Sequence, residues 1–214
     1  MTIHTLDPLQ LRVLGCLIEK QRTTPEQYPL TLNALRLACN QATNRDPVLQ
    51  LDESEVRAAA QSLGTLGWAR LATGPGSRTA KYRQLFGEAL DLMPAEISLL
   101  AVLMLRGPQT VNELKTRVER LHRFDATDDV VRTLEKLEGK ELIQPLGKQP
   151  GQREERWGHL LAGPGAGHAP TEPDEPDEPG PATGDTARTI EQRLAGVEGR
   201  LAELERVLAE RGLL

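Results

Sequence analysis

The sequence predicts an α+β protein, mainly helical, with two tandem winged-helix domains, a disordered acidic linker and a C-terminal coiled-coil helix. Residues 1–162 contain the same order of elements twice, three helices followed by a β-hairpin, which is a helix-turn-helix with an added wing. A segment rich in Pro, Gly and acid follows, and the last residues carry a heptad pattern. The expected domains are the two winged helices at 1–90 and 91–162, the linker at 163–187 and the coiled-coil helix at 188–214.

The first copy is defined by its helix starts and by apolar positions at helical spacing. Residues that favour the N-cap precede each expected helix; they are Asp7, Thr31 and Asp52. The expected buried faces follow the 3.6-residue period and comprise Leu11, Leu14, Leu17, Ile18, Leu32, Leu35, Cys39, Val56, Ala59, Ala60, Leu63 and Leu66. Strands at 68–72 and 79–85, joined by the turn GPGSR, complete this copy.

The second copy repeats the order with a shorter connection between its second and third helices. Its first helix is expected from Pro94 to Gly107, and its third from about Thr127. The second helix between them is expected to bury Val111, Leu114, Val118 and Leu121. The hairpin strands are expected at 142–146 and 153–159. Each copy is long enough to support a small core.

Charge is distributed unevenly along the chain. The net charge is −5. Residues 1–162 hold 21 Lys and Arg against 20 Asp and Glu, whereas residues 163–187 hold six acids and no base. The folded part is therefore nearly neutral, so any binding to nucleic acid must depend on local patches.

Targeting and catalytic signals are not found in this sequence. There is no secretory signal and no apolar run long enough to cross a membrane, so we expect a cytoplasmic protein. The four histidines are scattered, and neither a nucleophile elbow nor a phosphate-binding loop occurs. We expect no enzyme activity, no cofactor and no metal. Cys16 and Cys39 lie on apolar helix faces and are expected to be buried free thiols.

The last 25 residues or so predict a homodimer through a parallel coiled coil. The a and d positions alternate spacings of four and three; they are Ile190, Leu194, Val197, Leu201, Leu204 and Leu208. In a parallel dimer Arg193 meets Glu198 and Arg200 meets Glu205, whereas an antiparallel pair would oppose like charges. The alternative is a single amphipathic helix that folds back on its own domain.

The stretch EKQRTTPEQYPLTLNALRLACNQATNRDPV, residues 19–48, resembles the bacterial YceH-like proteins, an uncharacterised family of tandem winged helices. The resemblance covers residues 7 to about 161. It implies a tandem winged-helix fold, a bacterial cytosolic setting and a regulatory or DNA-binding role. It implies no ligand and no catalytic residue, and it says nothing of the linker or the zipper.

A DNA-binding surface is expected on the first copy. The third helix of a winged helix enters the major groove, and its exposed side offers Arg57 and Gln61 for base edges. The hairpin from Trp68 to Leu85 contains no acid. Its bases suit phosphates and comprise Arg70, Arg78, Lys81 and Arg83.

Acidic residues oppose this interpretation. Asp52, Glu53 and Glu55 stand at the start of the third helix, where they stabilise the helix dipole but repel phosphate. The second copy has acids at the same place, so we expect it to be structural or protein-binding. A protein-interaction adaptor that uses this fold without binding DNA is the alternative function. A regulator that senses an effector would need an apolar pocket between the copies.

Overall fold

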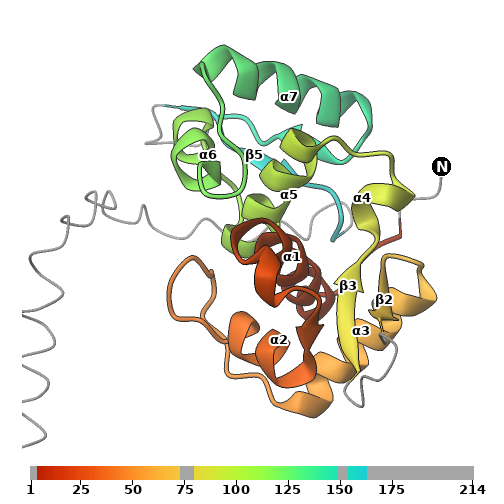
Figure 1. Ribbon diagram of the computed structural model, residues 1–214. Helices are drawn as coiled ribbons and strands as arrows, with labels where there is room; N and C mark the ends of the chain where they lie inside the picture. Colours follow the sequence, from red (N-terminus) through yellow and green to blue (C-terminus); the bar gives the residue numbers. More distant parts are fainter. Residues whose placement is uncertain (1–3, 73–79, 149–153, 163–214) are drawn as a thin grey trace, which may run out of the picture. The chain divides into compact units, whose positions relative to one another are not determined.

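The computed structural model describes residues 4–72, 80–148 and 154–162, which all belong to one compact unit spanning Met1–Pro170. We refer to residues 4–90 as the first half and to residues 91–162 as the second half. Arg78, the acidic linker and all the expected zipper positions lie outside the described residues. The described part is mainly helical, with small antiparallel sheets (Figure 1).

The helices of the first half begin where capping residues predict them. These helices are α1 (Pro8–Thr23), α2 (Leu32–Cys39) and α3 (Glu53–Thr65), with a short 3-10 helix at Pro25–Gln27. Asp7 accepts a hydrogen bond from the Gln10 N–H, and Thr31 accepts one from the Ala34 N–H. Asp52 accepts from the N–H groups of Ser54 and Glu55. Because such caps satisfy otherwise unpaired N–H groups, the local sequence fixes each helix start.

The sheet of the first half has one strand more than the sequence predicts. Strands β1 (Leu30–Thr31), β2 (Ala69–Ala72) and β3 (Lys81–Gln84) form an antiparallel sheet in the order β1-β3-β2. β1 has only two residues and pairs with β3 about fifty positions later, so no local pattern marks it. The short helix α4 (Phe86–Ala89) was also not expected.

The second half follows the predicted order. Its helices are α5 (Pro94–Arg106), α6 (Val111–Val118) and α7 (Thr127–Gly139), and its strands are β4 (Ile143–Pro145) and β5 (Trp157–His159). Gly107, with a positive φ of 70°, ends α5 as expected, because glycine adopts this conformation at little cost. β4 and β5 pair antiparallel.

The two halves share one connected apolar core, and α1 packs against α5 where they meet (Figure 1). A Cβ atom added at Gly15 of α1 would lie 2.8 Å from Cγ of Leu105, so this glycine permits the close approach of the helices. Backbone hydrogen bonds also join the halves. The Asp46 N–H donates to the Leu105 carbonyl (2.8 Å), and the Leu6 N–H donates to the Leu161 carbonyl (2.7 Å).

The predicted state of the cysteines is confirmed. Cys16 and Cys39 are buried free thiols within this core. The hydrogen bond with Cys16 and burial both raise the pKa of Cys39. A separate finding concerns membranes: none of the helices in the described ranges is both long and apolar enough to span one.

Candidate functional site

Three of the four bases expected in the first hairpin lie on one side of the sheet. In the β2–β3 pairing Arg70 is opposite Arg83 and Ala72 is opposite Lys81, so these side chains share a face. The alternate residues Tyr82 and Gln84 are buried on the other face. We call the outward side, which carries Arg70, Lys81 and Arg83, the basic face.

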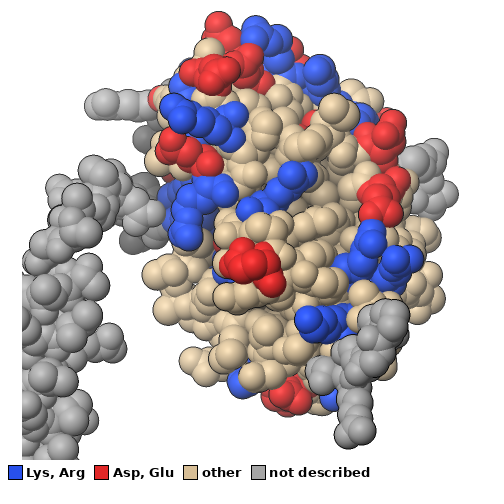
Figure 2. Space-filling view, viewed as in Figure 1, with Lys and Arg blue, Asp and Glu red and all other residues tan. Residues whose placement is uncertain are grey.

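The basic face keeps a positive balance although one of its charges is paired. Arg83 forms an ion pair with Glu88 of α4, whose side chain is 67% exposed. Arg70 is exposed and stands directly opposite Arg83, an arrangement that like charges disfavour in the absence of an anion. Figure 2 shows blue side chains in this region beside the grey segment.

The exposed side of α3 carries the two residues expected to read bases. Arg57 and Gln61 are both exposed, and α3 packs against β2 of the hairpin (Figure 1). In the structure Arg57, Gln61 and Arg70 are exposed. Lys81 and Arg83 are half-exposed.

The acids at the start of α3 are held in a capping box. Asp52 Oδ1 accepts hydrogen bonds from the Ser54 hydroxyl (2.6 Å) and from the Glu55 N–H (2.9 Å). These hydrogen bonds lower the pKa of Asp52. Glu55 in turn accepts from the Asp52 N–H (2.8 Å). The end of α3 that would approach a groove therefore presents the ionised carboxylate of Asp52 at neutral pH.

Two exposed or half-exposed bases of the second half have acidic partners. Arg156 donates to both carboxylate oxygens of Glu113, at 2.9 and 3.1 Å, and Arg132 pairs with Asp129 at the start of α7. Blue and red side chains are interspersed over α7 in Figure 2. This half offers a mixed surface rather than a basic one.

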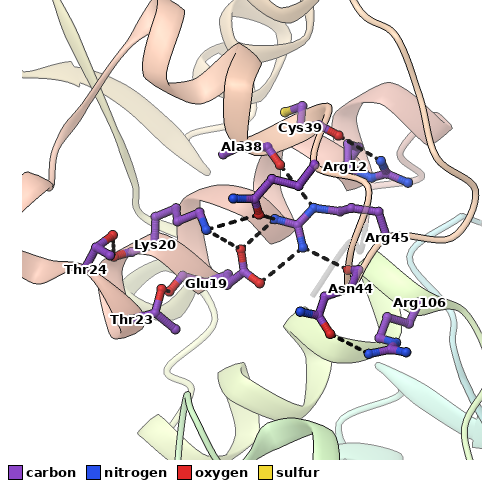
Figure 3. A network of polar contacts seen from close by, with 11 residues as sticks. Arg12, Glu19, Lys20, Thr23, Thr24, Ala38, Cys39, Asn44, Arg45 and Arg106 are labelled. Atoms are coloured by element: carbon purple, nitrogen blue, oxygen red, sulfur yellow. Dashed lines mark hydrogen bonds and ion pairs between the residues drawn. The ribbon is translucent and has the colours of Figure 1, made fainter. Parts of the chain in front are cut away.

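A buried network that the sequence did not reveal joins α1 to the loop that follows α2 (Figure 3). The Arg45 side chain has no exposed surface and donates two hydrogen bonds to Glu19, at 3.1 and 2.6 Å. It also donates to the carbonyls of Ala38 (3.1 Å) and Asn44 (2.8 Å). Buried charges persist only when they are paired and hydrogen-bonded, as Arg45 is here.

Burial and pairing act in opposite directions on Glu19. Burial alone would raise the pKa of Glu19, but its hydrogen bonds and attraction to Arg45 outweigh that effect and lower the pKa, with Lys20 adding to the shift. Glu19 is thus ionised at neutral pH. Glu19 and Arg45 are 26 positions apart in sequence, so no spacing rule could have joined them.

Arg12 also holds the loop to which Arg45 belongs, at residues 40–51. Its guanidinium donates to the Cys39 carbonyl (2.9 Å) and to the Pro47 carbonyl (2.5 Å), as Figure 3 shows for Cys39. Asn40 closes the loop, because its side chain exchanges two hydrogen bonds with the backbone of Leu51, each of 2.8 Å.

Comparison with known proteins places this architecture in a family. A family profile described as "Protein of unknown function, DUF480" matches residues 6–152, about two thirds of the chain, which therefore belongs to that family. This agrees with the resemblance to the bacterial YceH-like proteins drawn from residues 19–48.

Similar proteins occur in several bacteria, all described as UPF0502 proteins. One from Pseudomonas fluorescens strain Pf0-1 is 44% identical over 210 residues, covering 94% of both chains. One from Pectobacterium carotovorum strain PC1 is 39% identical over 213 residues, covering 96% of this chain and 97% of its own. One from Pelobacter propionicus is 44% identical over 210 residues, covering 95% and 94%. These alignments are long enough to extend past residue 162.

Proposed function

We propose that this protein is a bacterial cytosolic regulator of the tandem winged-helix type that binds double-stranded DNA through its first half. The observation that carries the proposal is the basic face, on which Arg70, Lys81 and Arg83 lie together next to α3. A helix-turn-helix protein places its recognition helix in the major groove. The order α1, α2, α3, β2, β3 supplies such a helix and an adjoining wing.

The contacts divide into two kinds in this proposal. The basic face binds phosphates and sets the position of the protein on the duplex. Arg78, which lies outside the described residues, is proposed for the same role from the sequence alone. Arg57 and Gln61 on the exposed side of α3 reach base edges and supply any sequence preference. The acids Asp52, Glu53 and Glu55 hold the affinity down and confine tight binding to low salt.

The DNA proposal is tested by titrating labelled duplex with the full chain at two salt concentrations. Arg70→Gln and Lys81→Gln should each weaken binding to all sequences and reduce the log–log salt slope by about 0.9. The matched control is Lys136→Gln on the exposed surface of α7, which should leave the slope unchanged. If the wild-type chain fails to bind duplex at low salt, the DNA proposal is abandoned.

Dimerisation through the C-terminal heptads is a second part of the proposal, and it rests on the sequence pattern alone. A parallel dimer would present two copies of the first half to a two-fold DNA site. Replacing Leu201 by Lys should give a monomer with the described part still folded, measured by sedimentation and circular dichroism. Equal masses for wild type and variant would contradict the zipper.

A protein-interaction adaptor is the second candidate function. It is favoured by Leu71, which is 54% exposed on β2 beside Arg70, and by Leu37 of α2, which is 55% exposed. Exposed apolar side chains can mark a surface that binds another protein. Two results together would favour the adaptor. The full chain would fail to bind duplex, and Leu71→Ser would abolish the binding of a protein partner that the wild-type chain retains.

A further inference from the structure

The two cysteines of the chain face each other where α1 packs against the end of α2. Arg12, Cys16 and Glu19 share one side of α1 because they are four and three positions apart. At one end of this row Arg12 donates to the Cys39 carbonyl (2.9 Å). At the other end Glu19 binds Arg45, which donates to the carbonyl of the residue before Cys39 (3.1 Å), as Figure 3 shows. Cys16, in the middle of the row, therefore lies beside Cys39.

The two thiols are in contact with each other and closed off from solvent. The Cys39 S–H donates a hydrogen bond to the sulfur of Cys16, and neither residue has any exposed surface. Both are free thiols, and the sequence contains no further cysteine. Sulfur atoms in hydrogen-bond contact need only a short further approach to reach the S–S bond length of about 2.05 Å. Oxidation should therefore join Cys16 to Cys39 rather than to another chain.

The surroundings of the two thiols give them different reactivity. Burial alone would raise the pKa of Cys16, but the hydrogen bond from Cys39 and the attraction to the buried Arg45 outweigh burial and lower the pKa. Arg12 acts in the same direction and Glu19 in the opposite one. The hydrogen bond and burial both raise the pKa of Cys39. Cys16 is therefore the thiol that ionises more readily, and the thiolate is the form that attacks an oxidant.

We propose that Cys16 and Cys39 form a redox-active pair that a hydroperoxide converts into an intramolecular disulfide. With hydrogen peroxide, the Cys16 thiolate attacks one oxygen, an S–O bond forms, the O–O bond breaks, and hydroxide leaves and takes up the proton lost by Cys16. The Cys39 sulfur then attacks the sulfenic acid on Cys16, so that an S–S bond replaces the S–O bond and a second water leaves with the Cys39 proton. Each sulfur gives up one electron, and the peroxide takes up both.

Burial of the pair selects the oxidant by size. Cys39 is the last residue of α2, and the loop at residues 40–51 follows it directly. Loops open locally at a lower cost in free energy than core helices do. We expect such an opening to admit hydrogen peroxide, which is little larger than water, and to exclude bulky aromatic disulfide reagents.

The disulfide would fasten α1 to the end of α2. About twenty residues lie between Cys16 and Cys39 in the chain. Closing a loop of this length reduces the conformational entropy of the unfolded chain. The oxidised chain should therefore unfold at a higher temperature than the reduced chain.

The test exposes the full, reduced chain to hydrogen peroxide, stops the reaction with catalase and counts thiols in denaturant. We expect the count to fall from two per chain to zero and to return to two after treatment with dithiothreitol. Non-reducing electrophoresis should show single chains only, and a peptide map should join Cys16 to Cys39. Before oxidation, the folded chain should not react with a bulky aromatic disulfide reagent.

Two matched variants separate the roles of the two thiols. In Cys39→Ser the sulfenic acid on Cys16 meets no second thiol, so dimedone, added in denaturant once the peroxide is removed, should label most of the chain. In Cys16→Ser the remaining thiol stays protonated in the core, so labelling should be about tenfold lower or less. Circular dichroism checks that both variants are folded, and the thiol count on the wild-type chain depends on neither of them.

Three outcomes would overturn the proposal. The first is a wild-type chain that keeps both thiols in peroxide that fully oxidises glutathione in the same solution. The second is a disulfide that links different chains, and the third is equal labelling of Cys16→Ser and Cys39→Ser by dimedone. The reaction involves no nucleic acid, so this proposal and the DNA proposal can fail separately.

Discussion

The two halves share the order of three helices and a β-hairpin, but they differ in the loop between the second and third helices. In the first half residues 40–52 separate α2 from α3, whereas residues 119–126 separate α6 from α7. The longer loop buries Arg45 against Glu19 and places Asp46 on the backbone of Leu105 in the other half. The extra residues therefore do two things at once, stabilising their own half and joining it to its neighbour.

The parts that do not differ show which features the repeated plan requires. Thr31 and Thr110 cap the second helix of each half, with the same 3.2 Å hydrogen bond to the N–H three residues on. The residue before each cap pairs with the last strand, Leu30 with Tyr82 and Gln109 with Trp157. The cap and this pairing are thus common to both halves, and the loop is the variable element.

The largest expected effect is on the free energy of unfolding, and it distinguishes an ion pair of the first half from one of the second. Glu19→Gln leaves the charge of Arg45 buried and poorly paired, which should lower the free energy of unfolding by about 3–5 kcal/mol. Glu113→Gln faces Arg156, which is 22% exposed, and glutamine still suits the capping box, so the loss should stay below about 1 kcal/mol. Urea denaturation of both variants measures the difference, and equal losses would refute it.

The packing of α1 against α5 can be tested with a pair of glycines. Gly15→Ala places a Cβ within 2.9 Å of two Leu105 atoms, and overpacking of this kind costs about 1–3 kcal/mol, partly offset by better helix propensity. Gly139→Ala near the end of α7 meets no atom within 4 Å and should be neutral or stabilising by up to about 1 kcal/mol. Urea midpoints check both, and a stabilised Gly15→Ala would show that the helices pack less closely.

Acid should act on the first half through Glu19. The pKa of Glu19 is lowered in the folded state, so the ionised form stabilises the protein above the unfolded pKa of about 4.3. That contribution is lost as the pH falls through the lower folded value. Asp52, which is exposed, and Asp129, which is half-buried, also have lowered pKa values and act in the same pH range. Unfolding curves of wild type and Glu19→Gln between neutral and acid pH should therefore converge as the pH falls, and parallel curves would contradict this assignment.

The smallest expected effect concerns the acids of α3. Glu53 is exposed and takes no part in the capping box of Asp52 and Glu55, so its replacement leaves the helix start intact. Glu53→Gln should tighten non-specific duplex binding by about twofold to fivefold, the gain from removing one exposed charge near phosphate. Glu135→Gln on α7 is the matched change in the second half and should have no effect.

The sequence predicts the parts of this fold that depend on contacts between residues close together in the chain, and it misses the parts that depend on distant residues. Caps such as Asp7 and Asp52 bond to groups within three residues, so they mark helix starts without tertiary information. β1 and the Glu19–Arg45 pair depend on groups far apart in the chain, and nothing in the local pattern indicates them.

The candidate site divides in the same way. Strand alternation places Arg70, Lys81 and Arg83 on one face, and this could be anticipated from the hairpin. The pairing of Arg83 with Glu88 could not, because α4 was not predicted. The cavity of about 140 Å³ where the halves meet is lined by residues of both, so no pattern in the sequence brings them together.

The most direct test of the central claim, that the first half binds duplex DNA and the second does not, is a map of backbone amide chemical shifts. The full, isotopically labelled chain is titrated with duplex at low salt. The proposed function predicts shifts concentrated in α3, β2 and β3, around Arg57, Arg70 and Lys81, with α6 and α7 unchanged. Shifts concentrated in α6 and α7, or none at all at saturating duplex, would contradict it.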